Sequence, residues 1–428
     1  MAGFRLSLSA VAAVGALLAG PSIALAQEQC LSFRDSLNTT IERAPEIAAA
    51  QARSAEAEAA LREARALRRP QVSTFGRGAV GDNGLSTSQI ENQYGIRVSQ
   101  RVYDFGDSGF ALAAAQAEID QQTSLENRER LSAARTVAEA YLTRLEAMAM
   151  IAVISERRDY FARQQAAVDA LLAQGGATRA ESAQIAAELA QAEAEMLDLQ
   201  SIADRAGIRI AEYTGVSIAL CDIDALENSV ARAMSALPSV EAAVDAALNA
   251  NPDIAARQAS VRTLEAQRDR ERNARLPVIE LVGIVSYAYD DLTEDWNTRD
   301  RLGVDVSVPL YTGDAIGARG DQAQARLRGE EYALRAQQRD VREEAQISYR
   351  RQLSLRAQYL RRQAVADSQL AYFEAISGEF QFGLGTLPDL VEARLGFEQA
   401  ELNVVRARFN LMREQLGLLH LTAQLLED

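Results

Sequence analysis

Histidine and cysteine, which supply much of the metal binding and nucleophilic chemistry of enzymes, are scarce in this sequence. Its 428 residues include one histidine, His420, and two cysteines, Cys30 and Cys221. We find no Cys-x-x-Cys pair, no histidine cluster, no glycine-rich phosphate loop and no nucleophile elbow, so metal and nucleophilic chemistry lack their parts. We therefore predict no catalytic residue, no metal site and no cofactor, and we interpret His420 as structural or solvent-facing.

The acidic pair with the most suggestive spacing is Asp389 and Glu392. Residues three apart share one face of a helix, so the two carboxylates would act together on whatever that face meets. Acidic residues in the first turn of a helix also complement the helix dipole. Taken alone, the pair is better explained as an ordinary acidic helix start than as a binding site.

The overall charge excludes one class of partner. Asp and Glu total 60 against 45 basic residues, which gives a net charge of −15. Nucleic-acid phosphates are bound by a basic stripe or patch, and we find no such stripe in the sequence. We therefore expect no nucleic-acid partner.

The first 26 residues read as a secretory signal peptide. Arg5 precedes an apolar run from about residue 6 to residue 18, and Ala24-Leu25-Ala26 forms a small-x-small cleavage site. Glu28 and Gln29, just before Cys30, do not fit the small residues that a lipoprotein signal needs. No later segment has the roughly 20 consecutive apolar residues of a membrane helix. A membrane location would therefore require a β-barrel.

The rest of the chain contains two copies of one pattern, about 207 positions apart. The run Pro45-Glu46-Ile47-Ala48-Ala49 matches Pro252-Asp253-Ile254-Ala255-Ala256. At the same offset Gln51, Glu58, Arg65, Arg68 and Pro70 match Gln258, Glu265, Arg272, Arg275 and Pro277; one position later, Gly95, Val98, Ser99 and Tyr103 match Gly303, Val306, Ser307 and Tyr311. We predict a first repeat at residues 27–220, a connector at 221–239 with little regular structure, and a second repeat at 240–428.

Each repeat is predicted to contain an opening helix, two strands, a long helix, a glycine break and a return helix. Pro70 and the turn cluster Gly81-Asp82-Asn83-Gly84 mark boundaries in the first repeat. The predicted elements there are 33–67, 71–80, 93–103, 107–173 and 178–213. In the second repeat they are 240–274, 278–289, 300–311, 315–377 and 388–419.

The four predicted strands alternate between apolar and polar residues, as strands with one greasy face do. The clearest cases are Tyr94, Ile96, Val98 and Val102 in the first repeat, and Leu302, Val304, Val306, Val308 and Leu310 in the second. Strands of about ten residues suit a membrane barrel, but four strands cannot close one. Three copies would give about twelve strands, an even number within the known range. The alternative is a soluble four-stranded sheet.

The predicted long helices would each be on the order of 100 Å in length, too long for the inside of a small domain. In the first, a heptad-like seam is expected at Leu131, Ala134, Ala138, Tyr141, Leu145, Met148 and Ala152. In the second, the corresponding seam is more polar: Val341, Ala345, Ser348, Gln352 and Leu355.

These features together resemble the TolC family of outer-membrane efflux and secretion channels. The resemblance lies in the duplicated order of elements, the strand ends Tyr103-Asp104-Phe105-Gly106 and Pro309-Leu310-Tyr311-Thr312-Gly313, and the run from Gly385 to Ala393. It implies a mostly α fold with a β-barrel portion: long periplasmic helical hairpins and four transmembrane strands per protomer, completed as a homotrimer. It also implies a passive exit duct in the outer membrane, working with a periplasmic adaptor and an inner-membrane transporter.

The resemblance gives several residues a role. It places Asp389 and Glu392 in a ring of carboxylates at the periplasmic entrance. The acidic member of the family's tunnel lock matches Glu181, but its tyrosine and arginine fall on Phe380 and Gly385, which lack the necessary groups. Arg179 is then the candidate partner of Glu181.

The two cysteines lie in regions that the family places near the middle of the tunnel. Because the signal peptide sends the chain to an oxidising compartment, we predict a disulfide between Cys30 and Cys221, with two unpaired thiols as the alternative.

Two rival functions are a periplasmic coiled-coil adaptor and a secreted hydrolase. The adaptor would lack lipid-facing strands and would extract without detergent. The hydrolase would need a convergent polar pocket that this composition does not offer.

Overall fold

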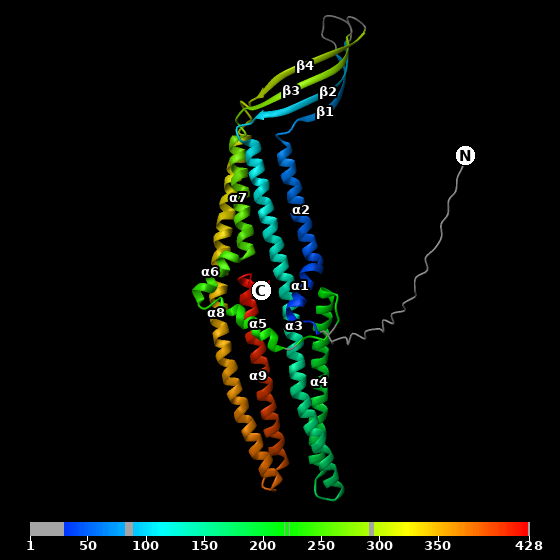
Figure 1. The fold of residues 1–428 in the computed structure, drawn as a ribbon, viewed down its shortest axis with the longest axis vertical. Helices are drawn as coiled ribbons and strands as arrows, with labels where there is room; N and C mark the ends of the chain where they lie inside the picture. The colour runs from blue at the N-terminus through cyan, green and yellow to red at the C-terminus, as the bar shows by residue number, and fades with distance from the viewer. Residues whose placement is uncertain (1–29, 82–88, 218, 222, 291–294, 427–428) are drawn as a thin grey trace, which may run out of the picture.

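The computed structural model describes residues 30–81, 89–217, 219–221, 223–290 and 295–426. The predicted signal peptide lies outside these residues. A four-stranded sheet stands at one end of an elongated molecule, and helices run from it to the opposite end (Figure 1). The elements are α1 (Phe33–Arg43), α2 (Pro45–Ala66), β1 (Gln71–Gly81), β2 (Gln89–Tyr103), α3 (Asp107–Ala173), α4 (Arg179–Thr214), α5 (Ile223–Ser235), α6 (Val240–Ala250), α7 (Pro252–Asn273), β3 (Val278–Asp290), β4 (Asp295–Ser307), α8 (Ala315–Gln381), α9 (Leu387–Leu421) and a short 3-10 turn at Gln424–Leu426.

The sheet is antiparallel, and its strands follow one another in chain order, β1-β2-β3-β4. The register places Val72 opposite Val98, Val98 opposite Gly283, and Gly283 opposite Leu302. Directly opposed residues share a face of a sheet, so these pairs define one side of it. Strands β1 and β4 are the two edges, and neither pairs with a further strand among the described residues.

Strand β4 ends earlier than the alternating sequence predicted. It stops at Ser307, whereas the prediction continued to Tyr311, and it begins at Asp295 rather than Asp300. Pro309 has no amide hydrogen to give to a strand ladder, so alternation alone could not extend the pairing past it. Of the predicted turn cluster, Gly81 ends β1 and the other three residues lie outside the described residues.

In both repeats the chain passes from strand to long helix through two successive residues with positive φ. Phe105 and Gly106 have φ of 48° and 99°, and Gly313 and Asp314, at the equivalent positions, have φ of 59° and 65°. Two successive left-handed residues redirect the chain within one peptide length. Such φ values are costly for Phe105, which has a Cβ, and the surrounding contacts must hold it there.

The helices confirm the duplicated, mostly helical architecture. Both α3 and α8 contain 67 residues, roughly 100 Å of helix each. Each folds back on its return helix at a glycine with positive φ, Gly175 before α4 and Gly383 before α9. The predicted glycine breaks are therefore confirmed. Among the described residues no helix is both long and apolar enough to cross a membrane.

The opening helices were predicted as single elements, and the structure divides each in two. Ala44 and Asn251 are extended (ψ 122° and 120°), and Pro45 and Pro252 begin the next helix. Proline disfavours the helical conformation in the residue before it and is well suited to the first turn of a helix. The same break occurs in both repeats because both prolines belong to the repeated pattern.

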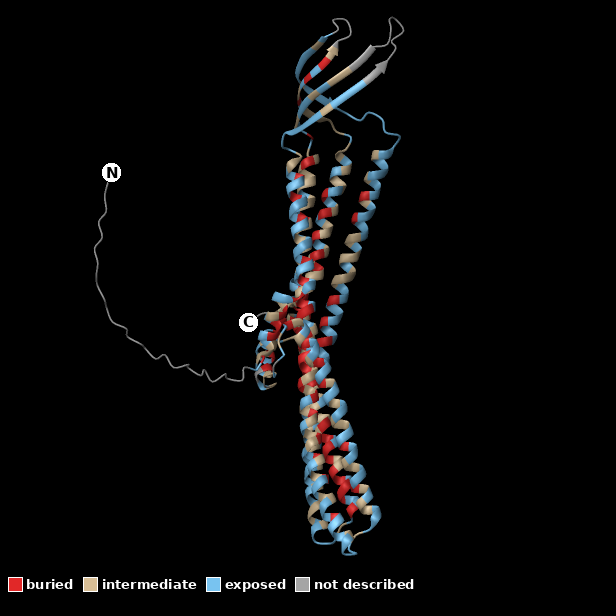
Figure 2. Ribbon diagram, turned by 90° about the vertical axis from the view of Figure 1, so that its right-hand side faces the viewer, coloured by how far each residue is buried: buried red, intermediate tan, exposed pale blue. Residues whose placement is uncertain are grey.

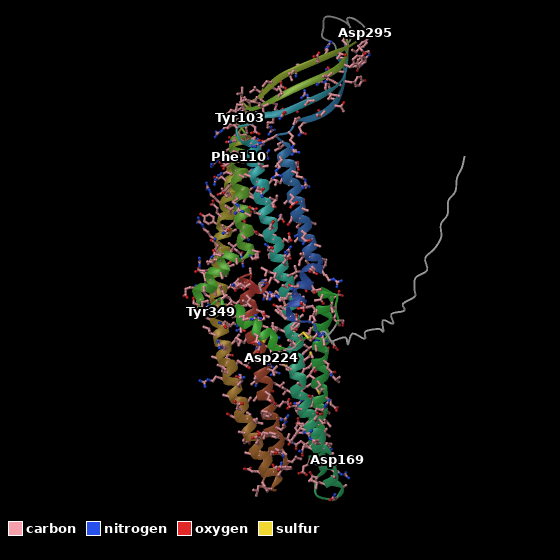
Figure 3. The ribbon with its side chains drawn as sticks, in the orientation of Figure 1. Tyr103, Phe110, Asp169, Asp224, Asp295 and Tyr349 are labelled. Atoms are coloured by element: carbon pink, nitrogen blue, oxygen red, sulfur yellow. A yellow bond between two sulfur atoms is a disulfide. The ribbon has the colours of Figure 1, made fainter. Side chains whose placement is uncertain are left out.

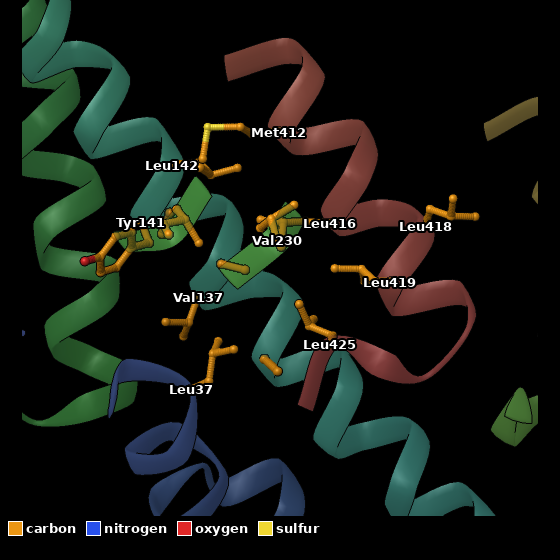
Figure 4. Close-up of a cluster of buried hydrophobic side chains, with 14 of the residues drawn as sticks. Leu37, Val137, Tyr141, Leu142, Val230, Met412, Leu416, Leu418, Leu419 and Leu425 are labelled. Atoms are coloured by element: carbon orange, nitrogen blue, oxygen red, sulfur yellow. The ribbon is translucent and has the colours of Figure 1, made fainter. Parts of the chain in front are cut away.

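The connector is more ordered than predicted. Its larger part forms α5, and a short parallel bridge joins Leu31 to Leu220 on its N-terminal side. Helix α5 carries buried Leu226 and Val230 into the main apolar core, which lies around the middle of the molecule (Figures 2 and 4). An amphipathic stretch of this kind is helical because the core covers its apolar side.

The first-half seam is confirmed from Leu131 to Leu145, where all five predicted residues are buried, but it is wrong beyond them: Met148 and Ala152 are exposed. In the second half, Val341, Ala345, Ser348 and Gln352 are buried and Leu355 is half-buried.

Candidate functional site

Asp389 lies at the start of α9, at the end of the molecule opposite the sheet. Its Oδ2 accepts hydrogen bonds from the backbone N–H (3.3 Å) and the hydroxyl (2.5 Å) of Thr386, whose Oγ1 in turn accepts from the N–H of Asp389. This is a capping box. Glu392 is exposed one turn further along. Asp389 therefore does lie in the first turn of a helix, as an ordinary acidic helix start would, and it also caps that helix. Both carboxylates remain at the surface of the helix tip.

Glu181 makes the equivalent cap on α4. Its carboxylate accepts from the N–H (2.7 Å) and hydroxyl (2.9 Å) of Thr178, and these hydrogen bonds lower the pKa of Glu181. Arg179 is exposed, and no ion pair joins it to Glu181 within the described part of this protomer. At the other tip, the backbone of Phe380 packs within 3.4 Å of where a Cβ on Gly385 would lie, so this turn leaves little room for a side chain there.

One face of the sheet is apolar and exposed. Its most exposed aliphatic members have exposed fractions between 54% and 77%: Val72, Ile96, Val285, Leu302, Val304 and Val306. At the end far from the helices, Trp296 stacks on Tyr94 and Tyr287, with ring centroids 5.7 and 5.2 Å apart. At the helical end, Tyr103 meets Phe105 edge-on (4.7 Å). Figure 3 marks these two ends by Asp295 and Tyr103, and the opposite tip of the molecule by Asp169. An apolar band flanked by aromatic residues is typical of membrane barrels.

A buried ionic cluster joins the two helical hairpins, and sequence reasoning missed it. Arg157 on α3 donates to Glu195 on α4 (2.6 Å), and its Nε lies 3.1 Å from Oε2 of Glu398 on α9. Arg394 lies over the rings of Tyr160, Phe373 and Phe397 at 5.4 to 5.5 Å. These residues lie far apart in the sequence, and each belongs to a helical stretch whose local sequence looks like that of a helix surface. The local sequence therefore gave no indication that they would meet in a buried cluster.

Burial raises the pKa of the Glu398 carboxyl. The carboxyl is 2% exposed, and this desolvation raises its pKa to about 7, against the opposing attraction of Arg157 and Arg394. Glu401, one turn further along, also has a raised pKa because of burial. The cluster therefore holds a carboxyl that changes charge near neutral pH at the contact between the hairpins.

Cys30 and Cys221 are bonded to each other in the structure. Tyr141 of α3 reaches the same place: it is 1% exposed, and its hydroxyl donates to the carbonyl oxygen of Leu31 at 3.0 Å. The start of the chain, the connector and the long helix therefore meet at one point. His420 lies near the end of α9 and is half-buried, and burial lowers its pKa.

Comparison with known proteins agrees with this architecture. The model of the family "Outer membrane efflux protein" matches residues 36–216 and 243–424, one match in each repeat. The chain is 26% identical over 367 residues to the outer membrane efflux protein BepC of Brucella suis biovar 1, covering 84% of this chain and 78% of BepC. It is 23% identical over 323 residues to the alkaline protease secretion protein AprF of Pseudomonas aeruginosa, covering 74% and 66%.

The fold is also that of solved channel structures. The outer membrane protein VceC of Vibrio cholerae superposes with a TM-score of 0.76 at 17% identity, covering 91% of this chain and 95% of VceC. The family model, the relatives and the shared fold all point the same way. This chain belongs to the outer membrane efflux protein family, the TolC-like channels of the bacterial outer membrane.

Proposed function

We propose that three copies of this chain form one continuous exit duct, with the sheet in the outer membrane and the helices extending through the periplasm. The observation that carries the proposal is the sheet: one face is apolar and exposed, and both edge strands, β1 and β4, have no neighbour within the described protomer. In a lipid environment each unpaired backbone group costs several kcal/mol, so the edges need partners. A β1 edge meeting the β4 edge of the next copy supplies them.

Three copies are the number that fits. Twelve strands, four from each copy, fall within the range of membrane barrels and keep the number even. The two helical hairpins of each copy, α3–α4 and α8–α9, would then surround the axis below the barrel. Helices as long as α3 and α8 can form the wall of a tunnel, and they do not need the large hydrophobic core of an ordinary globular domain.

The duct is passive, and other proteins supply its energy. The printed names of BepC and AprF refer to efflux and to protease secretion. By analogy, this chain would serve a tripartite efflux pump or a type I secretion system, together with a periplasmic adaptor and an inner-membrane transporter. The exposed hairpin tips, which include Phe382 (84% exposed) and Leu384 (81%), are the surfaces nearest such partners.

The periplasmic entrance would be ringed by Asp389 and Glu392. Threefold symmetry places three copies of each exposed carboxylate at the tips, which attracts cations. The tunnel lock is proposed to involve Glu181 and Arg179 across neighbouring copies, with helix packing supplying most of the closure because Phe380 and Gly385 lack polar groups.

The test is to measure assembly and membrane insertion together. The protein should require detergent for extraction and should have the mass of a trimer by light scattering. Val304→Arg places a charge on the apolar face, where it should cost about 2 to 4 kcal/mol near the bilayer midplane and reduce the amount of trimer in the membrane. Ser307→Arg, on the opposite face, is the matched control and should be mild. Equal tolerance of both changes, or a monomer that extracts without detergent, would contradict the proposal and favour the periplasmic adaptor.

A further inference from the structure

The middle of the polar face of the sheet is basic, although the chain as a whole is acidic. The register defines three successive rows across the four strands on this face: Ser73, Arg97, Ile284 and Arg301; Phe75, Gly95, Ser286 and Arg299; and Arg77, Gln93, Ala288 and Asn297. Four of these twelve positions are arginines and none is acidic. In a chain with 60 acidic and 45 basic residues, this is a pronounced separation of charge.

The arginines lie close enough to act together. Strands in a sheet are about 4.8 Å apart, and rows on one face follow at roughly 6.8 Å, so the three rows span on the order of 14 Å. Arg97 and Arg301 occupy the same row, separated only by Ile284. All four arginines are exposed and line one shared pocket. Arg77, Arg97 and Arg301 make no ion pair with any described residue.

Acidic residues stand outside this basic region. Glu280 and Asp305 lie two rows nearer the helices, where Glu280 is 3.8 Å from Arg101, and Asp295 lies one row nearer the loops. Asp300 comes between Arg299 and Arg301 in the sequence and contributes to the lining of the shared pocket. It opposes Val285, which places its side chain on the apolar face of the register. Arg77, Arg97 and Arg301 therefore have no carboxylate in their own rows and no ion pair with a described residue.

The middle row is flat, which leaves space between the arginines. Gly95 lies under the ring of Phe75: a Cβ at Gly95 would come within 2.8 Å of that ring and of the Cβ of Ser286. Gln93 donates to Ser286 Oγ (2.9 Å), so the polar groups beside the ring are fixed. Gly95 and the ring of Phe75 form the base of this region, and the arginines lie around them. In the proposed trimer the polar face lines the inside of the barrel, so a solute there could reach the arginines.

We propose that this face binds solutes carrying multivalent oxyanion groups, such as phosphates, sulfates or clustered carboxylates, on their way out through the barrel. The inference rests on the proposed trimer, in which β1 of one copy meets β4 of the next. Arg77 on β1 would then come beside Arg299 and Arg301 on β4, and four arginines per copy would make a ring of twelve. Each guanidinium presents a fork of N–H donors that matches two oxygens of an oxyanion. A ring of one sign inside a pore also concentrates the opposite ion.

Calorimetry on the full mature protein, in detergent and with its disulfide intact, tests the site with inorganic tripolyphosphate as the probe. The wild-type trimer should bind the probe, more weakly as the salt concentration rises. Arg97→Gln/Arg301→Gln should weaken binding at least tenfold. These side chains are exposed, so the variant should assemble; Arg97→Gln alone, with an intermediate loss, provides a second measurement. Arg53→Gln/Arg62→Gln removes the same charge from the exposed side of α2 and should leave the affinity within twofold.

Mass by light scattering and conductance in planar bilayers, recorded on the same preparations, separate the two proposals. A wild-type trimer that conducts but binds no tripolyphosphate overturns the anion site and leaves the duct standing. Equal weakening by the two double variants overturns the site as well, because it would show attraction by net charge alone. A monomer without conductance overturns both proposals.

Discussion

Tyr141 and Tyr349 make the same hydrogen bond in the two halves of the chain. Tyr141 donates its hydroxyl hydrogen to the carbonyl oxygen of Leu31 (3.0 Å), and Tyr349 donates to that of Pro238 (2.8 Å). Each acceptor directly precedes a serine that caps an opening helix, Ser32 before α1 and Ser239 before α6. The bond thus holds the start of each repeat to the middle of its own long helix, and the repeated pattern has kept it twice.

Replacing either tyrosine by phenylalanine should destabilise the protein through the lost hydrogen bond. A typical intramolecular hydrogen bond contributes about 0.5 to 1.5 kcal/mol. The carbonyl oxygen of Leu31 still accepts from the N–H of Cys221 (3.1 Å) and Pro238 is exposed, so neither acceptor is left buried without a partner. We expect Tyr141→Phe to cost more than Tyr349→Phe, since the exposed fractions are 1% and 8%. Guanidinium unfolding of both single variants and of the double variant measures this. The two sites lie on different helices, so the losses should add; unchanged midpoints in both single variants would contradict the structural role.

The stability of the protein should fall as the pH rises toward neutrality because of Glu398. Its pKa is about 7 in the folded protein against an ordinary 4.5. Between these values the unfolded chain has released the proton that the folded chain still holds, so stability from this group is complete below pH 4.5 and is lost as the pH rises through 7. The full loss is about 3 kcal/mol at 1.36 kcal/mol per unit of pKa.

Glu398→Gln should flatten this dependence between pH 5 and pH 8. Guanidinium unfolding at several pH values measures the slope for wild type and variant. Glu392→Gln, an exposed position on the same helix, is the matched control and should keep the slope of the wild type. The charged neighbours Arg157, Glu195, Arg394 and Glu401 are unchanged in both variants. Parallel curves for wild type and Glu398→Gln would show that this carboxyl is not the group that titrates.

Removing the link between Cys30 and Cys221 should destabilise the protein by about 2 to 5 kcal/mol. The two residues are 191 positions apart, and in the chain-entropy model a longer closed loop gives a larger stabilisation of the folded state. Cys30→Ser/Cys221→Ser should therefore unfold at lower guanidinium concentration than the oxidised wild type, and at the same concentration as the reduced wild type. Peptide mapping without reduction checks the bond itself: alkylation of both cysteines in the protein as isolated would rule it out.

Neutralising the tip carboxylates should weaken cation block of the channel. Asp389→Asn/Glu392→Gln removes the charge with the least change in shape, which matters because Asp389 caps α9. In planar bilayers, block by a trivalent cation on the periplasmic side should decrease and cation preference should fall, while the trimer stays intact. Asp169→Asn, in the first hairpin near the same tip, should leave block unchanged. Unaltered block in the double variant would place the constriction elsewhere and leave Asp389 as a helix cap alone.

Much of the architecture was predictable because the sequence contains the same pattern of elements in two repeats. The long helices begin at Asp107 and Ala315 as predicted, since a glycine-containing turn and a change of composition mark both starts. Pro45 and Pro252 were recognised as repeat markers, but their effect on the preceding residue was overlooked, so two helix breaks were missed. Alternation extended β4 through Pro309 for a similar reason: a hydrophobic pattern does not show which residues can donate to a ladder.

The contacts between distant segments could not be predicted in this way. Arg157 and Glu398 lie on different hairpins, and nothing in either local sequence indicates that they meet. Tyr349 was absent from the predicted seam of α8, although its counterpart Tyr141 was included, because that seam was placed one position before the residues that match the first seam. A position-by-position comparison of the two repeats would have found Tyr349. For the ionic cluster no such signal exists, because each partner looks like an ordinary surface residue of a helix.

The aromatic stack at the far end of the sheet provides a spectroscopic probe. Trp296 is the only tryptophan in the chain, and it stacks on both Tyr94 and Tyr287 on the apolar face. All tryptophan emission of the protein therefore comes from one place, at the end of the sheet that the helices do not reach. Its wavelength should shift to the blue as this face leaves water for lipid, so insertion of the strands can be followed in real time without a label and without measuring conductance.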